Sequence, residues 1–343
     1  MTKEFRLREN MLYCPLDKSQ VDNFFSLVDY RNNYFTSNDP EKIIEFYNGF
    51  ENRDQLIQWM KERPKGSHRI HEVEGEKDII VVIPTADYNG KFARECRENI
   101  FKGLHIIFVE NGGKGDFYFN YAHNCNIGIK KAMDYSPKWI AISNDDVIKI
   151  DSVSTLAEQL SSIDPDYKYL VRANKNLYDN YVSKRMYEFR TAGLPLILKS
   201  YFHSWFDQAV LMRLPYEFRT FNTSFHEIRR RSVKRILLWK FFNKRLFLFI
   251  NINSFGIISG KYAYLKQGNV FYETFISGFE DIFLSLNLAR EGKVELIDYK
   301  IKALEGMTLG GPTDPKKHLT RGMRDVVNYI LIDELENNYF ANR

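Results

Sequence analysis

Apolar residues downstream of residue 78 fall into short continuous runs with helix-like segments between them. The run Ile79-Ile80-Val81-Val82-Ile83 is β-branched and stops at Pro84, which is typical of a strand buried on both faces. Further apolar runs occupy residues 104–109 and 139–142, and the intervening segments 91–101 and 121–135 have helical patterns. This alternation predicts an α/β fold with a mostly parallel sheet flanked by helices.

A polar cluster follows each of the three predicted strands. The clusters are Pro84-Thr85-Ala86-Asp87, Glu110-Asn111-Gly112-Gly113 and Asn144-Asp145-Asp146. Ligands of parallel sheets bind at the carboxyl ends of strands, so we expect a binding site where these clusters meet. The chain has no GxGxxG motif after the first strand and no GxxxxGK[ST] motif, which excludes the usual dinucleotide and P-loop phosphate cradles. A bound nucleotide would then need a divalent cation held by carboxylates.

Residues outside this region form two further units. We expect residues 1–77 to be an accessory segment with two short helices, one capped by Asn38 or Asp39 with Pro40 at its first position, and one over residues 54–62. Residues 78–315 are then the main domain, with a basic and aromatic insertion at residues 180–250. Residues 316–343 are expected to form a helical tail.

Composition and charge narrow the class of protein. The 343 residues carry 49 basic and 44 acidic side chains and three cysteines, and the first 13 residues are charged throughout. The odd cysteine count and the absence of a signal-like apolar core predict a cytoplasmic protein, and the small net charge of +5 does not suggest nucleic-acid binding.

One basic segment stands out against this balance. Residues 227–250 hold eight Lys or Arg and the single acid Glu227, interleaved with aromatic residues. The segment is either a basic element with its charges in water or a peripheral contact with an anionic membrane, at its cytoplasmic face.

Residues 78–309 resemble the family-2 glycosyltransferases, which have the Rossmann-like GT-A fold. VVIPTADYN is similar to the first strand and nucleotide-binding turn of that family, FVENGG to its second strand, and AHNCNIGIKKA to its Asn-x-Gly-Ile helix start. The resemblance implies contacts with a nucleoside-diphosphate sugar from Pro84, Thr85, Asp87, Glu110 and Asn126.

ISNDDV occupies the place of the DxD motif of these enzymes. The resemblance implies that Asn144 and Asp145 contact the nucleotide and that Asp146, with Asp145 as a further candidate, binds Mn²⁺ or Mg²⁺. Such a cation neutralises the diphosphate leaving group as its bond to the sugar breaks. The family commonly adds a late His as a metal ligand; here Glu305 and His318 are the candidates for that position.

Residues 268–298 are similar to the acceptor-side signature of the same family. Glu280-Asp281 opens an apolar helical pattern that Gly292 would end, and two carboxylates are favourable at the positive end of a helix dipole. The resemblance implies that Asp281 is the catalytic base of an inverting transfer and that Glu280 contacts the acceptor.

These features together predict a metal-dependent inverting glycosyltransferase whose acceptor hydroxyl belongs to a glycan or a lipid-linked saccharide. Asp-Asp or Glu-Asp alone would more often be a solvated turn or a helix cap; their joint occurrence in order favours the functional interpretation. One alternative is a sugar-phosphate nucleotidyltransferase, although PTADYNGKFAR lacks the Gly-rich basic loop of that class. The other is a non-catalytic glycosyltransferase-like protein that binds nucleic acid or a membrane through residues 227–250.

Overall fold

A seven-stranded mixed sheet is the centre of the computed structural model, which describes residues 30–111, 118–173, 179–183, 213–218, 225–229, 249–250, 255–276, 278–303 and 315–341. Its strand order is β1-β3-β2-β4-β10-β6-β11. The strands are β1 (Arg69–Val73), β2 (Glu76–Thr85), β3 (Leu104–Glu110), β4 (Trp139–Ser143), β6 (Leu170–Arg172), β10 (Phe255–Ser259) and β11 (Val294–Leu296). Strands β2, β3 and β4 confirm the three apolar runs of the sequence.

The prediction of a mostly parallel sheet is wrong, because two strands run against the others. Strand β2 is parallel to β3 and β4, and β6 is parallel to β11. Strand β10 lies between β4 and β6 and is antiparallel to both, while β1 is antiparallel to β3 at one edge. A run such as Phe255-Gly256-Ile257-Ile258 shows that a strand is buried, but its direction depends on which strands it pairs with.

Helices cover both faces of the sheet and build two apolar cores. On one face, α4 (Lys91–Glu95) with the following π-helical turn (Cys96–Ile100), and α6 (Val153–Ser161), pack against the odd-numbered side chains of β2, including Val81 and Ile83. On the other face, α5 (Tyr121–Met133), α10 (Gly260–Leu265) and α11 (Glu280–Arg290) pack against Ile80 and Val82. The continuous apolar run of β2 is therefore buried on both faces, as its sequence predicts.

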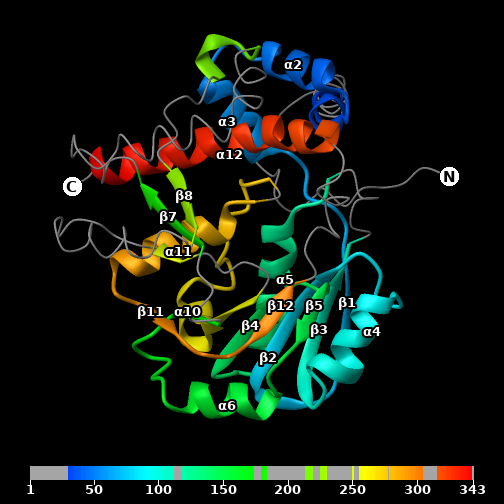
Figure 1. Ribbon diagram of the computed structural model, residues 1–343, viewed down its shortest axis with the longest axis vertical. Helices are drawn as coiled ribbons and strands as arrows, with labels where there is room; N and C mark the ends of the chain where they lie inside the picture. Colours follow the sequence, from blue (N-terminus) through cyan, green and yellow to red (C-terminus); the bar gives the residue numbers. More distant parts are fainter. Residues whose placement is uncertain are drawn as a thin grey trace, which may run out of the picture.

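A third core joins the two ends of the described chain. Helices α2 (Pro40–Asn48) and α3 (Arg53–Glu62) pack on α12 (Pro315–Ala341), with the 3-10 turn at Tyr216–Phe218 and one side of α11, and Figure 1 shows α12 crossing the molecule beside α2 and α3. Asp39 caps α2 through the Glu41 amide, with Pro40 at the first position, as expected. Strand β1, although it precedes residue 78, belongs to the main sheet.

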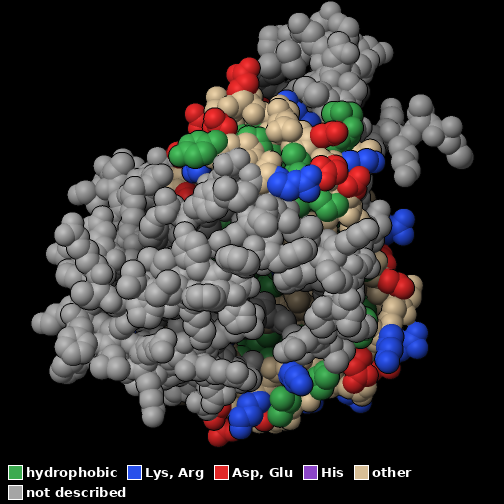
Figure 2. Space-filling model, turned by 45° about the horizontal axis from the view of Figure 1, so that its top comes forward, with side chains coloured by type: hydrophobic (Ala, Val, Ile, Leu, Met, Phe, Trp, Pro, Cys, Tyr) green, Lys and Arg blue, Asp and Glu red, His purple; other side chains and the backbone are tan. Residues whose placement is uncertain are grey.

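Two smaller sheets complete the described structure. Strands β5 (Val147–Lys149) and β12 (Ile301–Ala303) pair antiparallel, and β7 (Asp179–Ser183) lies between β8 (Phe225–Arg229) and β9 (Phe249–Ile250). Most of the basic segment 227–250 lies outside the described residues. Within the described part of the chain, no helix is long and apolar enough to span a membrane. Where Figure 2 colours the surface, basic and acidic side chains are interspersed.

Candidate functional site

The carboxyl ends of β2, β3 and β4 lie together at one edge of the sheet, as their parallel pairing requires. Thr85 and Glu110 are register partners, and the amide of Asn111 donates to the Thr85 carbonyl at 3.1 Å. The Thr85 hydroxyl donates to Asp145 Oδ2 at 2.7 Å. The three polar clusters of the sequence thus meet at one edge, as predicted, and Thr85 lies beside the Asp145 carboxylate.

Two adjacent carboxylates at this edge are largely removed from water. Asp146 is 6% exposed. Burial and the neighbouring charge of Asp146 raise the pKa of Asp145, although the Thr85 hydroxyl opposes the shift. Both residues are held between β4 and β5, which begins at Val147. Two crowded carboxylates supply the hard oxygen ligands that Mg²⁺ and Mn²⁺ prefer, and a cation would relieve their repulsion.

The set of metal ligands is incomplete in the described residues. They contain no group of three or more His, Cys, Asp or Glu side chains placed to hold a metal ion. Glu305 lies outside the described residues, and so does the side chain of His318, although His318 belongs to α12. The two carboxylates of the Asn144-Asp145-Asp146 corner fit a cation in chemistry, and the third ligand stays a prediction.

Glu280 and Asp281 occupy the first turn of α11, as the sequence predicts. The residue before them, Phe279, has a left-handed backbone with φ 73°, a conformation that costs a bulky residue of the order of 1–3 kcal/mol. Its ring packs edge-on against Tyr329 of α12, with centroids 4.7 Å apart. Packing against α12 therefore stabilises the strained turn that begins α11, and the two carboxyl groups follow directly after it.

Glu280 is a buried acid with a raised pKa. It is 6% exposed, and burial together with the charge of Asp281 raises its pKa to about 8. Its Oε2 atom has no hydrogen-bond partner among the described residues. Glu280 is thus protonated over most of the neutral range and can donate a hydrogen bond.

Tyr121, the first residue of α5, connects the two acidic corners. Its hydroxyl donates to Asn144 Oδ1 at 3.0 Å. Burial raises its pKa well above 10, and the charges of Glu280 and Asp281 contribute to the same shift. Burial also raises the pKa of the Cys125 thiol, one turn further along α5, and the charges of the same two acids add to that shift. Residues 144 and 280–281 therefore converge on the start of α5, although more than 130 residues separate them in the chain.

Sequence reasoning missed Tyr121. It stands directly before the AHNCNIGIKKA segment, and a tyrosine at a helix start carries no signal of its own. Only its hydrogen bond to Asn144 and the effect of Glu280 and Asp281 on its pKa reveal its position in the site.

Glu110 and Asp87 have local partners in the structure. Glu110 accepts the Tyr88 amide at 3.0 Å and pairs with His71 at 2.9 Å, and these two contacts lower its pKa. The His71 and Tyr88 rings stack with centroids 4.2 Å apart.

Asp87 is exposed and accepts the Asn89 amide at 2.9 Å. Pro84 is buried within β2, opposite Val109. None of these contacts is to the acidic pair Asp145-Asp146 after β4.

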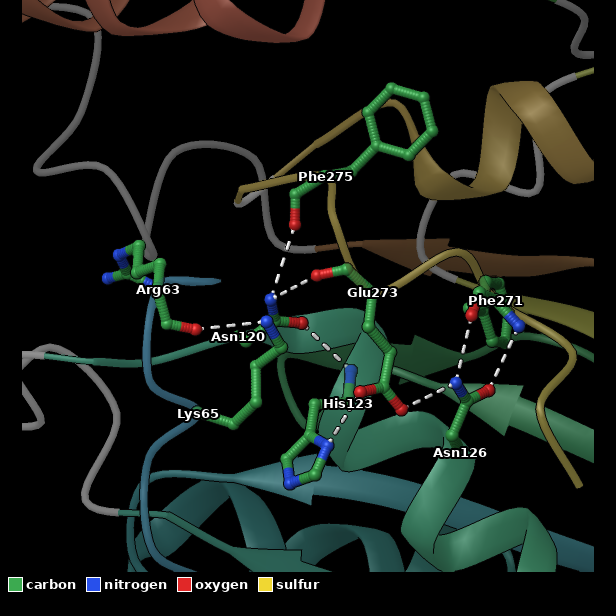
Figure 3. Close-up of polar contacts among 8 residues, drawn as sticks. All are labelled: Arg63, Lys65, Asn120, His123, Asn126, Phe271, Glu273 and Phe275. Atoms are coloured by element: carbon green, nitrogen blue, oxygen red, sulfur yellow. Dashed lines mark hydrogen bonds and ion pairs between the residues drawn. The ribbon is translucent and has the colours of Figure 1, made fainter. Parts of the chain in front are cut away.

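Asn126 holds the segment before α11 against α5, and Figure 3 shows these contacts. Its Nδ2 donates to the Phe271 carbonyl and to Glu273 Oε1, and its Oδ1 accepts the Phe271 amide, each at 2.9 Å. The residue is fully buried. In the structure Asn126 therefore positions the 271–273 segment, while the nucleotide contact implied by the resemblance stays untested.

Glu273 completes this polar cluster. Its Oε2 pairs with His123 Nδ1 at 3.0 Å, and the contacts with His123 and Asn126 outweigh burial and lower its pKa. Asn120, the N-cap of α5, donates to the carbonyls of Glu273 and Phe275, as Figure 3 shows. The segment leading to Glu280 is thus tied to the same helix that carries Tyr121.

Comparisons with known proteins do not assign this chain to a family. No protein-family model matches the chain, and no curated protein sequence matches it.

Proposed function

We propose that this protein is a metal-dependent inverting glycosyltransferase with a GT-A type fold. It would move a sugar from a nucleoside-diphosphate sugar to a hydroxyl of a glycan or lipid-linked acceptor. The observation that carries the proposal is the position of Tyr121, which hydrogen-bonds Asn144 and lies within the electrostatic influence of Glu280 and Asp281. The resemblance assigns those two acidic corners to the donor and acceptor sides, and both interact with Tyr121, one by a hydrogen bond and the other through its charge.

The donor side is the Asn144-Asp145-Asp146 corner. Asp146, with Asp145 beside it, would hold Mg²⁺ or Mn²⁺, and the bound cation would supply charge neutralisation for the departing diphosphate. Thr85 orients the Asp145 carboxylate through its hydroxyl. Burial of both acids raises the strength of their interaction with a cation, because the local dielectric is low.

The acceptor side is the first turn of α11. An acceptor oxygen attacks the anomeric carbon as the bond from that carbon to the diphosphate oxygen breaks, and Asp281 takes the proton of the acceptor hydroxyl. The donor leaves as a nucleoside diphosphate, and the configuration of the sugar inverts because one displacement occurs. Glu280, protonated near neutral pH, would donate a hydrogen bond to an acceptor oxygen.

Two substitutions separate these roles. Asp281→Asn should lower the transfer rate by about 10²- to 10⁴-fold, the usual contribution of a general base, and leave donor binding largely unchanged. Asp146→Ala should weaken donor binding in the presence of Mn²⁺ and have little effect in its absence. Calorimetric titration and a transfer assay measure the two effects, after a thermal-shift panel of UDP, GDP, dTDP and CDP sugars with Mn²⁺ has identified the donor.

Asp134→Asn is the matched control, because Asp134 is an exposed acid at the other end of α5. It should leave binding and transfer unchanged. A fully active Asp281→Asn enzyme would contradict the assignment of the base, and absence of binding by every sugar nucleotide would contradict the function.

A further inference from the structure

A two-stranded ribbon follows the acidic corner of β4 directly. Strand β5 begins immediately after Asp146 and pairs antiparallel with β12, so that Ile148 stands opposite Lys302; Figure 1 shows the two strands side by side. The Asp151 amide donates to the Lys300 carbonyl at 3.0 Å. The two segments therefore stay paired just beyond the assigned strands.

The two faces of this ribbon differ from what burial alone requires. Val147, Tyr299 and Ile301 are buried in the core that the ribbon shares with α4 and α6. On the outer face, Ile148 is 42% exposed and Ile150 is 56% exposed. An antiparallel ribbon with one buried face normally carries polar side chains on the other. Packing within the chain therefore does not account for the two outward isoleucines.

Two lysines border these isoleucines. Lys300 and Lys302 alternate with the buried residues of the β12 segment and are exposed. Side chains directly opposite each other in an antiparallel pair have Cβ atoms about 4.5–5.5 Å apart, so Lys302 lies beside Ile148. The same register, continued by one step, places Lys300 beside Ile150.

The neighbouring charged groups leave this face basic. Lys149, between the two isoleucines, points away from them, because its Nζ donates to the Asn99 carbonyl of the π-helical turn at 3.3 Å. Asp151, at the end of the ribbon, accepts the Lys300 amide through Oδ2 at 2.8 Å. The outer face thus combines two aliphatic side chains with two ammonium groups.

This combination favours a lipid surface over other macromolecules. Aliphatic side chains can enter the boundary between headgroups and acyl chains, while lysines lie among anionic headgroups. A stable protein partner usually contacts about 20–30 residues on each side, far more than this ribbon presents. Single-stranded nucleic acid is bound by stacking on aromatic rings, and the outer face has isoleucine and lysine instead.

We propose that the outer face of the β5–β12 ribbon, formed by Ile148, Ile150, Lys300 and Lys302, docks on a bilayer that contains anionic phospholipid. This surface is separate from the basic segment 227–250. The proposal concerns binding alone and holds whether or not the protein transfers a sugar. Because β5 begins directly after Asp146, docking would bring the bilayer close to the acidic corner.

Vesicle flotation of the full chain tests the proposal, with phosphatidylcholine alone and with an equal mixture of phosphatidylcholine and phosphatidylglycerol. The protein should float with the anionic vesicles, bind neutral ones more weakly, and be released from the anionic ones by added salt. The double variants Ile148→Gln/Ile150→Gln and Lys300→Gln/Lys302→Gln should each lower the partition coefficient on anionic vesicles by about tenfold or more.

Two substitutions at other exposed positions are the matched controls. Leu265→Gln removes an exposed aliphatic side chain from α10, and Lys102→Gln removes an exposed lysine just before β3. Both should float as the unaltered protein does. Circular dichroism checks that each variant is folded, and either double variant suffices if the other fails to fold.

Three results would overturn the proposal. The first is that the unaltered protein does not bind anionic vesicles. The second is that binding is unchanged in the folded double variants, which would assign the membrane contact to another surface, such as residues 227–250. The third is that Leu265→Gln or Lys102→Gln weakens binding as much as the ribbon variants do. Failure of sugar-nucleotide binding or of transfer would leave the result intact, because the vesicle assay contains no sugar nucleotide.

Discussion

At the residue scale, the first turn of α11 combines two unfavourable states. Phe279 has a left-handed backbone, and Glu280 is buried with a pKa raised to about 8. Strain and desolvation of this kind persist only where the surrounding structure holds them, and they concentrate at functional sites. Here the Phe279 ring packs on Tyr329, and the charge of Glu280 contributes to the raised pKa values of Tyr121 and Cys125.

The raised pKa of Glu280 predicts a specific dependence of stability on pH. In the unfolded chain its pKa returns to the ordinary glutamate value of 4.5, so between about pH 4.5 and pH 8 the folded protein holds a proton that the unfolded chain has released. Stability then falls as pH rises through this window. Glu280→Gln cannot titrate, so its stability relative to the unaltered protein should rise by a few kcal/mol from about pH 5 to about pH 8.5.

Urea denaturation at both pH values measures the difference. Glu291→Gln, at the exposed end of the same helix, is the control and should show little change between them. A stability difference between Glu280→Gln and the unaltered protein that does not vary with pH would show that Glu280 titrates normally in the folded state.

At the scale of elements, α5 organises the site because it connects several of its parts. Its first residue, Tyr121, bonds to Asn144, and its N-cap and second turn hold the 271–275 segment. The helix also approaches the sheet very closely at Gly128, where an added Cβ would lie 2.2 Å from Val82 Cγ1 and 3.1 Å from Val109 Cγ2.

Gly128→Ala should therefore push α5 away from β2 and lower the free energy of unfolding by about 1–3 kcal/mol. Gly322→Ala is the matched control, since Gly322 lies in α12 with no atom within 4 Å of an added Cβ. It should stabilise the protein by up to about 1 kcal/mol, because alanine is the better helix former. Thermal and urea denaturation compare the two; equal effects would mean that the contact at Gly128 is not tight.

At the scale of the whole molecule, α12 connects the amino-terminal helices to the site. The Tyr47 hydroxyl of α2 donates to the Met323 carbonyl at 2.6 Å. Asn328 exchanges two hydrogen bonds with the backbone of Ile276, just before the strained turn. The segments at residues 30–62 and 315–341 are thus part of the structure that supports α11.

Ile330→Ala tests this dependence. Ile330 is 1% exposed in the core shared by α2, α3, α11 and α12, and its truncation should lower the free energy of unfolding by about 2–5 kcal/mol. Leu265→Ala removes a similar side chain from an exposed position on α10, where about 0.5 kcal/mol or less is expected. Urea denaturation of both variants gives the comparison, and a small loss for Ile330→Ala would mean that α12 is dispensable for the fold.

Local pattern was enough to locate many of the elements. The β-branched run at Ile79–Ile83 required a strand buried on both faces, and Asp39 before Pro40 required a helix start, because each depends on residues adjacent in the chain. The placement of polar residues after three strands also predicted that Thr85, Glu110 and Asp145 would lie at one edge.

The sequence by itself therefore determined the elements, their α/β order and the positions of the acidic pairs, since these follow from short-range periodicity and sterics. Only the tertiary structure decided that β10 runs against its neighbours, that Tyr121 bonds to Asn144, and that Glu280 is buried. The physical reason is that strand direction, desolvation and the unsatisfied Oε2 of Glu280 depend on contacts between segments far apart in the chain, which no local pattern encodes.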